Sequence, residues 1–217
     1  MLIPEHYTHE QGSTLPIAYA TAWSSLYSHA IKLQAGQTVL CLGTGGVSLA
    51  AAQLALIAGA KAIITSSSQR KLDRARQILA PLTHGRDDAI QTIDYSKIDK
   101  WDDEVKRLTR GRGVDFVIEI GGRGTLGRSL RSTKRGGFVA ISGELAGVLL
   151  HELTGRLPVQ LRVDPAGSAG RGHRQADLVL CGIRPRSLRR KPHGRGEHGP
   201  GSVIRSCRTG HRQGLRL

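Results

Sequence analysis

Short apolar runs alternate with longer runs of mixed character between residues 38 and 143. The apolar runs are nearly continuous in hydrophobic residues and lie at 38–42, 62–66, 90–94, 114–120 and 137–141. Strands of a parallel sheet covered on both faces have this character, whereas a half-exposed strand alternates apolar and polar residues. The pattern therefore predicts five buried, parallel strands.

The segments between these runs have the length and composition of helices, which are predicted at 47–58, 69–79, 101–109 and 125–132. Because crossovers between parallel strands are right-handed, this alternation predicts an α/β fold with a doubly wound parallel Rossmann sheet. Another helix is expected upstream at 16–30. Downstream, one more helix and a sixth strand at 158–163 would give a sheet of five to six strands.

The same pattern divides the chain into three segments. Residues 1–36 are predicted to be a linker and helix, 37–163 an NAD(P)-binding Rossmann domain, and 164–217 a basic tail. No regular period holds in the tail, and no Phe, Trp or Tyr follows Phe138. Such a segment buries too little apolar surface to offset its chain entropy, so we expect the tail to be disordered.

The formal charge of +15 arises mainly near the C-terminus. Residues 156–217 hold 14 Lys and Arg against three Asp and Glu, a net of +11, which leaves +4 for residues 1–155. Non-specific binding of nucleic acid or another polyanion through the tail is therefore an alternative function, although no aromatic side chain is present there to stack bases. The abrupt change near Arg156 is also what a shifted reading frame would produce.

The cysteines and the N-terminal residues indicate in which cellular compartment the protein is expected. The chain has three cysteines and no CxxC spacing, which implies neither a disulfide framework nor a zinc ribbon. No apolar run approaches the ~18 residues needed to span a bilayer, and the N-terminal residues do not resemble a signal peptide. A cytoplasmic protein with no membrane partner is expected.

The first predicted strand runs into a glycine turn, GTGGVS, that opens the next predicted helix. Gly43 permits a tight turn, and Gly45 would let a pyrophosphate approach the backbone without meeting a Cβ atom. Ser48 stands where the G-x-G-x-x-G fingerprint has its third glycine, and its hydroxyl can bond within the turn. Since the free N–H groups of a helix N-terminus attract phosphate, the turn predicts a dinucleotide site, with a purely structural turn as the alternative.

The end of the second predicted strand bears on which dinucleotide is bound. NAD-selective sites place a carboxylate there for the ribose 2′-hydroxyl, but this sequence has Ser66 and Ser67 followed by Arg70 and Lys71. Hydroxyl donors and cations suit a 2′-phosphate, so NADP(H) is preferred over NAD(H). The alternative is that the serines cap the next helix and the cations are simply solvated.

Motifs across residues 3–155 resemble one known family. The segments LPIAYATAW, AGQTVLCLGTGGVSLAAAQLA, AKAIITSSSQRKLDRAR, VKRLTRGRGVDFVIEIGGRGTL and KRGGFVAISGELAG resemble the cofactor-binding half of medium-chain dehydrogenases/reductases. The similarity is greatest to zinc-type alcohol dehydrogenase-like and quinone oxidoreductase-like members. It implies hydride transfer between a nicotinamide and an alcohol, carbonyl or activated alkene, and a possible homodimer.

The resemblance also implies roles for individual residues. The pyrophosphate would be contacted by Gly43, Gly45, Gly46 and Val47. The 2′-phosphate would be bound by Ser67 and Lys71, with Tyr95 near the adenosine. The residues beside the nicotinamide would be Thr21, Gly121 and Gly143.

The sequence departs from the family in several ways. Family enzymes carry an N-terminal catalytic domain that holds the substrate and, in zinc members, the metal, and this sequence begins where that domain ends. We therefore expect no zinc, assign no catalytic residue, and expect reduced or no independent activity on an unknown small-molecule substrate. The connection at 80–89 is longer than usual and predicts a surface insertion. A Rossmann-type methyltransferase is a weaker alternative, because it would favour an acid where Ser66 stands.

Overall fold

The structure is a computed structural model that describes residues 3–28, 31–142, 159–163 and 176–179. One sheet of seven strands, in the order β3-β2-β1-β4-β5-β6-β7, forms its centre. The first five strands are parallel, and β6 and β7 are antiparallel additions at the β5 edge. The strands are β1 (Thr38–Leu42), β2 (Lys61–Ser66), β3 (Ile90–Asp94), β4 (Val114–Glu119), β5 (Thr133–Ile141), β6 (Val159–Val163) and β7 (Ala176–Val179).

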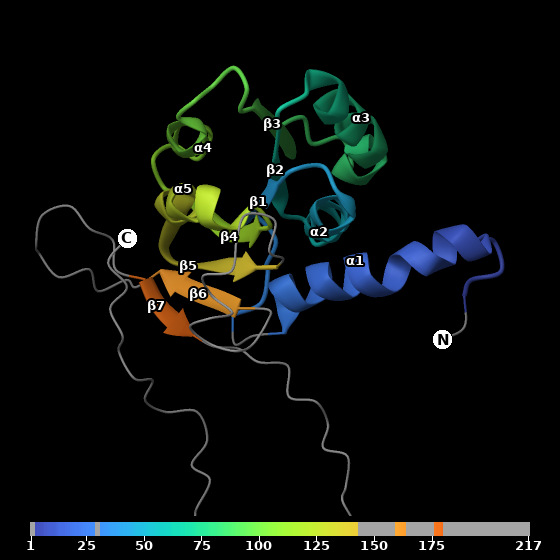
Figure 1. Cartoon of the computed structure of the whole chain (residues 1–217). Coiled ribbons are helices and arrows are strands. Elements are labelled where there is room, and N and C mark those ends of the chain that lie inside the picture. The colour runs from blue at the N-terminus through green and yellow to red at the C-terminus, as the bar shows by residue number, and fades with distance from the viewer. Residues whose placement is uncertain (1–2, 29–30, 143–158, 164–175, 180–217) are drawn as a thin grey trace, which may run out of the picture.

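Helices cover both faces of the parallel part (Figure 1). They are α1 (His9–Tyr27), α2 (Gly46–Ile57), α3 (Gln69–Leu79), α4 (Trp101–Leu108) and α5 (Leu126–Ser132), with short 3-10 helices η1 (Ala80–Thr83) and η2 (Gly122–Gly124). Alternate residues of β1 serve two separate cores. Val39 and Cys41 join the core under α1, α2 and α3, while Leu40 and Leu42 join the core under α4 and α5. This explains why the strand reads as continuously apolar.

The predicted α/β doubly wound fold is confirmed, with two corrections at its edge. The sixth strand lies where expected but runs antiparallel to β5, so the parallel part has five strands. Residues 176–179, inside the segment expected to lack order, form β7 against β6. They belong to an apolar run, ADLVL, within the basic segment, and β6 offers them an open edge of unpaired backbone groups. The helix expected before the sixth strand lies outside the described residues.

The first helix begins earlier than the sequence pattern predicts. It starts at His9 rather than near residue 16, because Thr8 and Gln11 form a capping box in which the Thr8 hydroxyl accepts from the Gln11 N–H and the Gln11 side chain accepts from the Thr8 N–H. Pro16 then lies inside the helix rather than at its start. None of the described helices combines the length and apolar character needed to cross a membrane.

The connection between α3 and β3 covers the end of α2. Residues 80–83 form η1, and Arg86 then reaches back to the C-terminal end of α2. Its guanidinium donates to the carbonyls of Leu56, Gly59 and Ala60 at 3.0 to 3.3 Å. Since the last carbonyls of a helix have no partner within the helix, Arg86 in this connection helps to cap α2.

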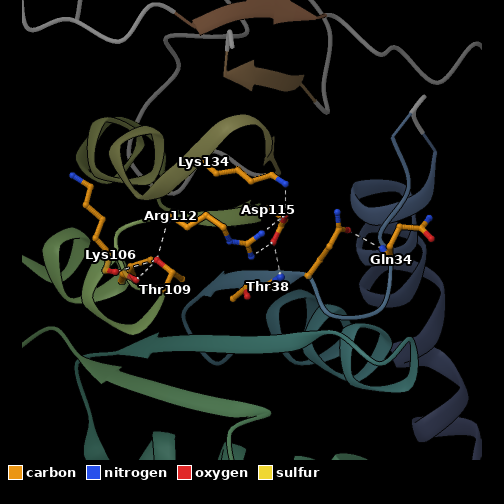
Figure 2. Close-up of polar contacts among 10 residues, drawn as sticks. Gln34, Thr38, Lys106, Thr109, Arg112, Asp115 and Lys134 are labelled. Carbon is orange, nitrogen blue, oxygen red and sulfur yellow. Dashed lines mark hydrogen bonds and ion pairs between the residues drawn. The ribbon is translucent and has the colours of Figure 1, made fainter.

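A buried carboxylate joins three strands at their amino-terminal ends (Figure 2). Asp115 accepts a hydrogen bond from the Thr38 N–H at 2.8 Å and one from Arg112 at 2.9 Å, and it pairs with Lys134 at 2.5 Å. These contacts tie β1, the segment before β4, and β5 together. They lie at the edge of the sheet opposite to the glycine turn.

Candidate dinucleotide site

Four loops meet at the carboxyl-terminal edge of the parallel strands. Gly43 follows β1, Ser67 follows β2, Tyr95 follows β3 and Gly121 follows β4. The chain reverses its winding between β1 and β4, because α2 and α3 cover one face while α4 and α5 cover the other. Ligands of open α/β sheets bind at this edge, beside this change of direction.

The glycines of the turn differ in backbone conformation and in the space around them. Gly43 has φ +77°, a left-handed conformation that favours glycine. A Cβ on Gly46 would lie 3.4 Å from the Cβ of Ala18 on α1, which is an ordinary van der Waals contact. Gly45 has an ordinary extended backbone, and a Cβ there would meet no described protein atom within 4 Å. Neither backbone conformation nor packing within the described chain requires glycine at 45, which is the N-cap of α2 and borders the pocket beside the turn.

Ser48 stabilises the turn directly. Its hydroxyl is buried and donates to the carbonyl of Leu42, the last residue of β1, at 2.6 Å. The expected bond within the turn is confirmed. The serine thus ties the first turn of α2 to its strand, a packing role that the third glycine of the fingerprint fills by being small.

A pocket of about 640 Å³ opens beside the glycine turn, between α2 and α3. Its lining combines turn backbone, serines, cations and an apolar wall: Gly43, Thr44, Gly45, Leu49, Ser66, Ser67, Arg70, Lys71, Arg74, Ala75, Ile78 and Tyr95. Three of these side chains are cationic and none is acidic. The pocket therefore suits a ligand that carries anionic groups next to an apolar or aromatic one.

The cations of the pocket are exposed and lack protein partners within the described part of the chain. No hydrogen bond or ion pair of the Arg70, Lys71 or Arg74 side chain occurs there, and Asp73 on the same helix is engaged by Gln69 at 2.8 Å. Asp94, at the end of β3, is also engaged. Hydrogen bonding from Ser96 holds the pKa of Asp94 below its usual range, so this carboxylate is ionised but faces Ser96 and Lys97.

The structure brings most of the predicted residues together. Those that line the pocket are Gly43, Gly45, Ser66, Ser67, Arg70, Lys71 and Tyr95. Gly46 and Val47 lie just beyond it in the first turn of α2, Thr21 lies on α1, and Gly121 follows β4. Gly143 lies outside the described residues. The sequence reasoning did not name Thr44, Leu49, Arg74, Ala75 or Ile78, although the spacing of Arg74 and Ile78 from Arg70 places all three on one helix face.

Sequence reasoning also missed Glu119, which holds the loop after β4. Its fully buried carboxylate accepts from the N–H groups of Gly121 and Gly122 at 2.7 and 3.0 Å, from the Thr125 hydroxyl at 2.5 Å, and from the Ser129 hydroxyl. A buried charge with this many donors is well satisfied. The available signal was an acid at the end of an apolar strand, two residues before a pair of glycines.

The family model for zinc-binding dehydrogenases matches residues 46–169, which is more than half of the chain. The chain belongs to the zinc-binding dehydrogenase family. This confirms the resemblance to medium-chain dehydrogenases/reductases and identifies the described parallel sheet as their cofactor-binding domain.

Individual relatives of this dehydrogenase domain agree with the family assignment. A zinc-type alcohol dehydrogenase-like protein of Schizosaccharomyces pombe is 40% identical over 144 residues, which are 66% of this chain and 39% of that protein. The structure of an NAD-dependent alcohol dehydrogenase has a TM-score of 0.57 at 32% identity, over 67% of this chain and 39% of its own. A mycobacterial protein solved with NADPH has a TM-score of 0.57 at 30% identity, over 67% and 42%.

The chain spans about two fifths of the length of these relatives. The family is described as zinc-binding. In the part of this dehydrogenase domain that the structure describes, no group of three His, Cys, Asp or Glu side chains lies close enough together to hold a metal ion. The expectation that this chain binds no zinc stays a prediction.

Proposed function

We propose that the chain is the NADP(H)-binding domain of an oxidoreductase that transfers hydride to or from an alcohol, carbonyl or activated alkene. The observation that carries the proposal is Gly45. At this position neither conformation nor a described neighbour calls for glycine, while a pyrophosphate seated on the turn would. The open N-terminus of α2 supplies unpaired N–H groups for that anion.

The preference for NADP(H) rests on the lining of the pocket. Ser66 and Ser67 stand where an NAD-selective site has an acid, and Arg70 and Lys71 lie beside them without protein partners in the described residues. A 2′-phosphate carries up to two negative charges and only accepts hydrogen bonds, so it matches hydroxyls and cations. The 2′-hydroxyl of NAD(H) would find no carboxylate in this lining.

The nicotinamide would supply the hydride chemistry when bound, and the chain's residues bind and orient it. The pyrophosphate and the adenosine end of the cofactor would be held by different parts of the site. The turn at Gly43 to Gly46 would hold the pyrophosphate, and the serines and cations after β2 would hold the adenosine end near Tyr95. The loop that Glu119 holds would then lie beyond the turn, and Gly121 in that loop would lie near the nicotinamide.

Titration of the full chain with NADPH and NADH, followed by nicotinamide fluorescence, tests the proposal. We expect NADPH to bind at least about tenfold more tightly than NADH. A Gly45→Asp variant should lose most NADPH binding, because its carboxylate would face the pyrophosphate, yet it should unfold at the same or a higher temperature because Asp is a favoured N-cap. Gly45→Asn is the neutral match and separates steric from charge effects.

Absence of binding by either nucleotide at millimolar concentration would refute the proposal. So would a Gly45→Asp variant that binds NADPH as the parent does. Two further expectations from the sequence, a homodimer and non-specific nucleic-acid binding through residues 164–217, stay predictions. Loss of salt-dependent RNA binding from a chain ending near residue 155 would assign that binding to the basic segment.

A further inference from the structure

A third cation lines the pocket one helical turn beyond Arg70. Arg74 lies four residues later on α3, so both guanidinium groups extend from the same face of the helix, with Lys71 beside them. Like charges at this spacing repel each other and destabilise a helix. No carboxylate in the described residues offsets them, although the same helix carries Asp73, which bonds to Gln69 instead.

Several other arginines are engaged by the protein. Arg76, two residues further along α3, donates to the Thr92 hydroxyl of β3 at 2.9 and 3.2 Å and does not line the pocket. Arg107 forms an ion pair with Glu104, and Arg112 forms one with Asp115. Arg74 has the same charge and a similar exposed position but no such partner in the described part of the chain, and it lines the pocket together with Arg70 and Lys71.

We propose that Arg74 is a specificity-determining residue that completes a three-cation subsite for a ribose 2′-phosphate, together with Arg70 and Lys71. This inference rests on the proposed NADP(H) function. A phosphate monoester near neutral pH carries nearly two negative charges and three acceptor oxygens, so it can accept from three cationic donors, whereas the 2′-hydroxyl offers one uncharged acceptor oxygen. Ala75 and Ile78 on the same helix line the pocket beside these cations.

Binding of four nucleotides to the full chain tests this assignment. NADPH and NADH differ only in the 2′-phosphate, and so do the fragments 2′,5′-ADP and 5′-AMP. In an Arg74→Ala variant we expect the dissociation constants of NADPH and 2′,5′-ADP to rise about fivefold to twentyfold, since the lost bond is charge-assisted but partly exposed to solvent. Those of NADH and 5′-AMP should stay within twofold.

Matched variants separate a local contact from general charge. Arg76→Ala removes the same charge from the same helix and should change the NADPH affinity less than twofold. Arg74→Lys should restore part of the NADPH affinity, because it keeps the charge without the planar pair of donors. An equal loss of NADPH and NADH binding in Arg74→Ala, no loss at all, or an equal effect of Arg76→Ala would overturn the assignment. If the parent chain binds neither nucleotide, the failure lies with the proposed function itself.

Discussion

Replacing Asp115 by alanine should destabilise the fold more than removing either of its cationic partners. Asp115 is 1% exposed and joins the buried Thr38 N–H to Arg112 and Lys134 at the amino-terminal edge of the sheet (Figure 2). Its loss affects two different kinds of group. The backbone N–H of Thr38 stays buried without this acceptor, whereas the two cations have access to water.

The solvent exposure of each group that Asp115 contacts determines how much the loss of that contact lowers the free energy of unfolding. An unsatisfied buried donor costs about 1–3 kcal/mol. The side chains of Arg112 and Lys134 are 50% and 30% exposed, so water can replace much of each ion pair, and each adds at most about 1 kcal/mol. Asp115→Ala should therefore lower the free energy of unfolding by about 2–4 kcal/mol, a large part of the ~5–15 kcal/mol typical of a domain. Asp115→Asn keeps an acceptor for Thr38 and should cost about 1–2 kcal/mol.

Urea unfolding of the full chain, followed by the fluorescence of the buried Trp101 and by circular dichroism, measures these differences. Arg112→Ala and Lys134→Ala should each cost less than about 1 kcal/mol. If either costs as much as Asp115→Ala, then the ion pairs rather than the buried N–H carry the stability, and the reasoning is wrong. Because this cluster lies at the opposite edge from the pocket, Asp115→Asn should bind NADPH as the parent chain does.

Two other substitutions test individual contacts. Ser48→Ala removes the buried bond to the Leu42 carbonyl and should lower stability by about 1–3 kcal/mol; a variant as stable as the parent would show that this hydroxyl does not hold the turn. Burial raises the pKa of the Cys41 thiol to about 12, which makes its thiolate about a thousandfold rarer at pH 8 than that of a free cysteine. In a chain with serine at Cys181 and Cys207, the remaining thiol should react with iodoacetamide only after unfolding, and rapid labelling of the native chain would contradict its burial.

The sequence predicts the centre of the sheet well because both faces of it are covered. β1 and β3 have the predicted bounds, and β2 and β4 differ from prediction by one residue at one end. A strand between two helical layers is buried on both faces and reads as a nearly continuous apolar run, as TVLCL does in β1. The glycine turn is equally readable, since Gly43 needs a left-handed conformation that few other residues adopt.

The bounds, directions and contacts of the outer elements depend on interactions that the local hydrophobic pattern does not reveal. The direction of β6 depends on how the chain returns to β5, and its five residues read the same in either orientation. The start of α1 depends on a capping box whose Thr8 and Gln11 are unremarkable until the backbone brings them together. Glu119 looks like the end of a strand, and only the fold gathers four donors around its carboxylate.

The cations show most clearly where sequence reasoning stops. In the stretch QRKLDRAR the arginines at 70, 74 and 76 are chemically identical, and net charge assigns them no separate roles. In the structure Arg76 is engaged by Thr92, whereas Arg70 and Arg74 line the pocket without a partner in the described residues. A cation that already has a protein partner contributes mainly to stability, and one held near like charges without such a partner gains most from an external anion. The distinction between a solvated face and a phosphate subsite is therefore a question of partners, and paired variants two residues apart on one helix can answer it.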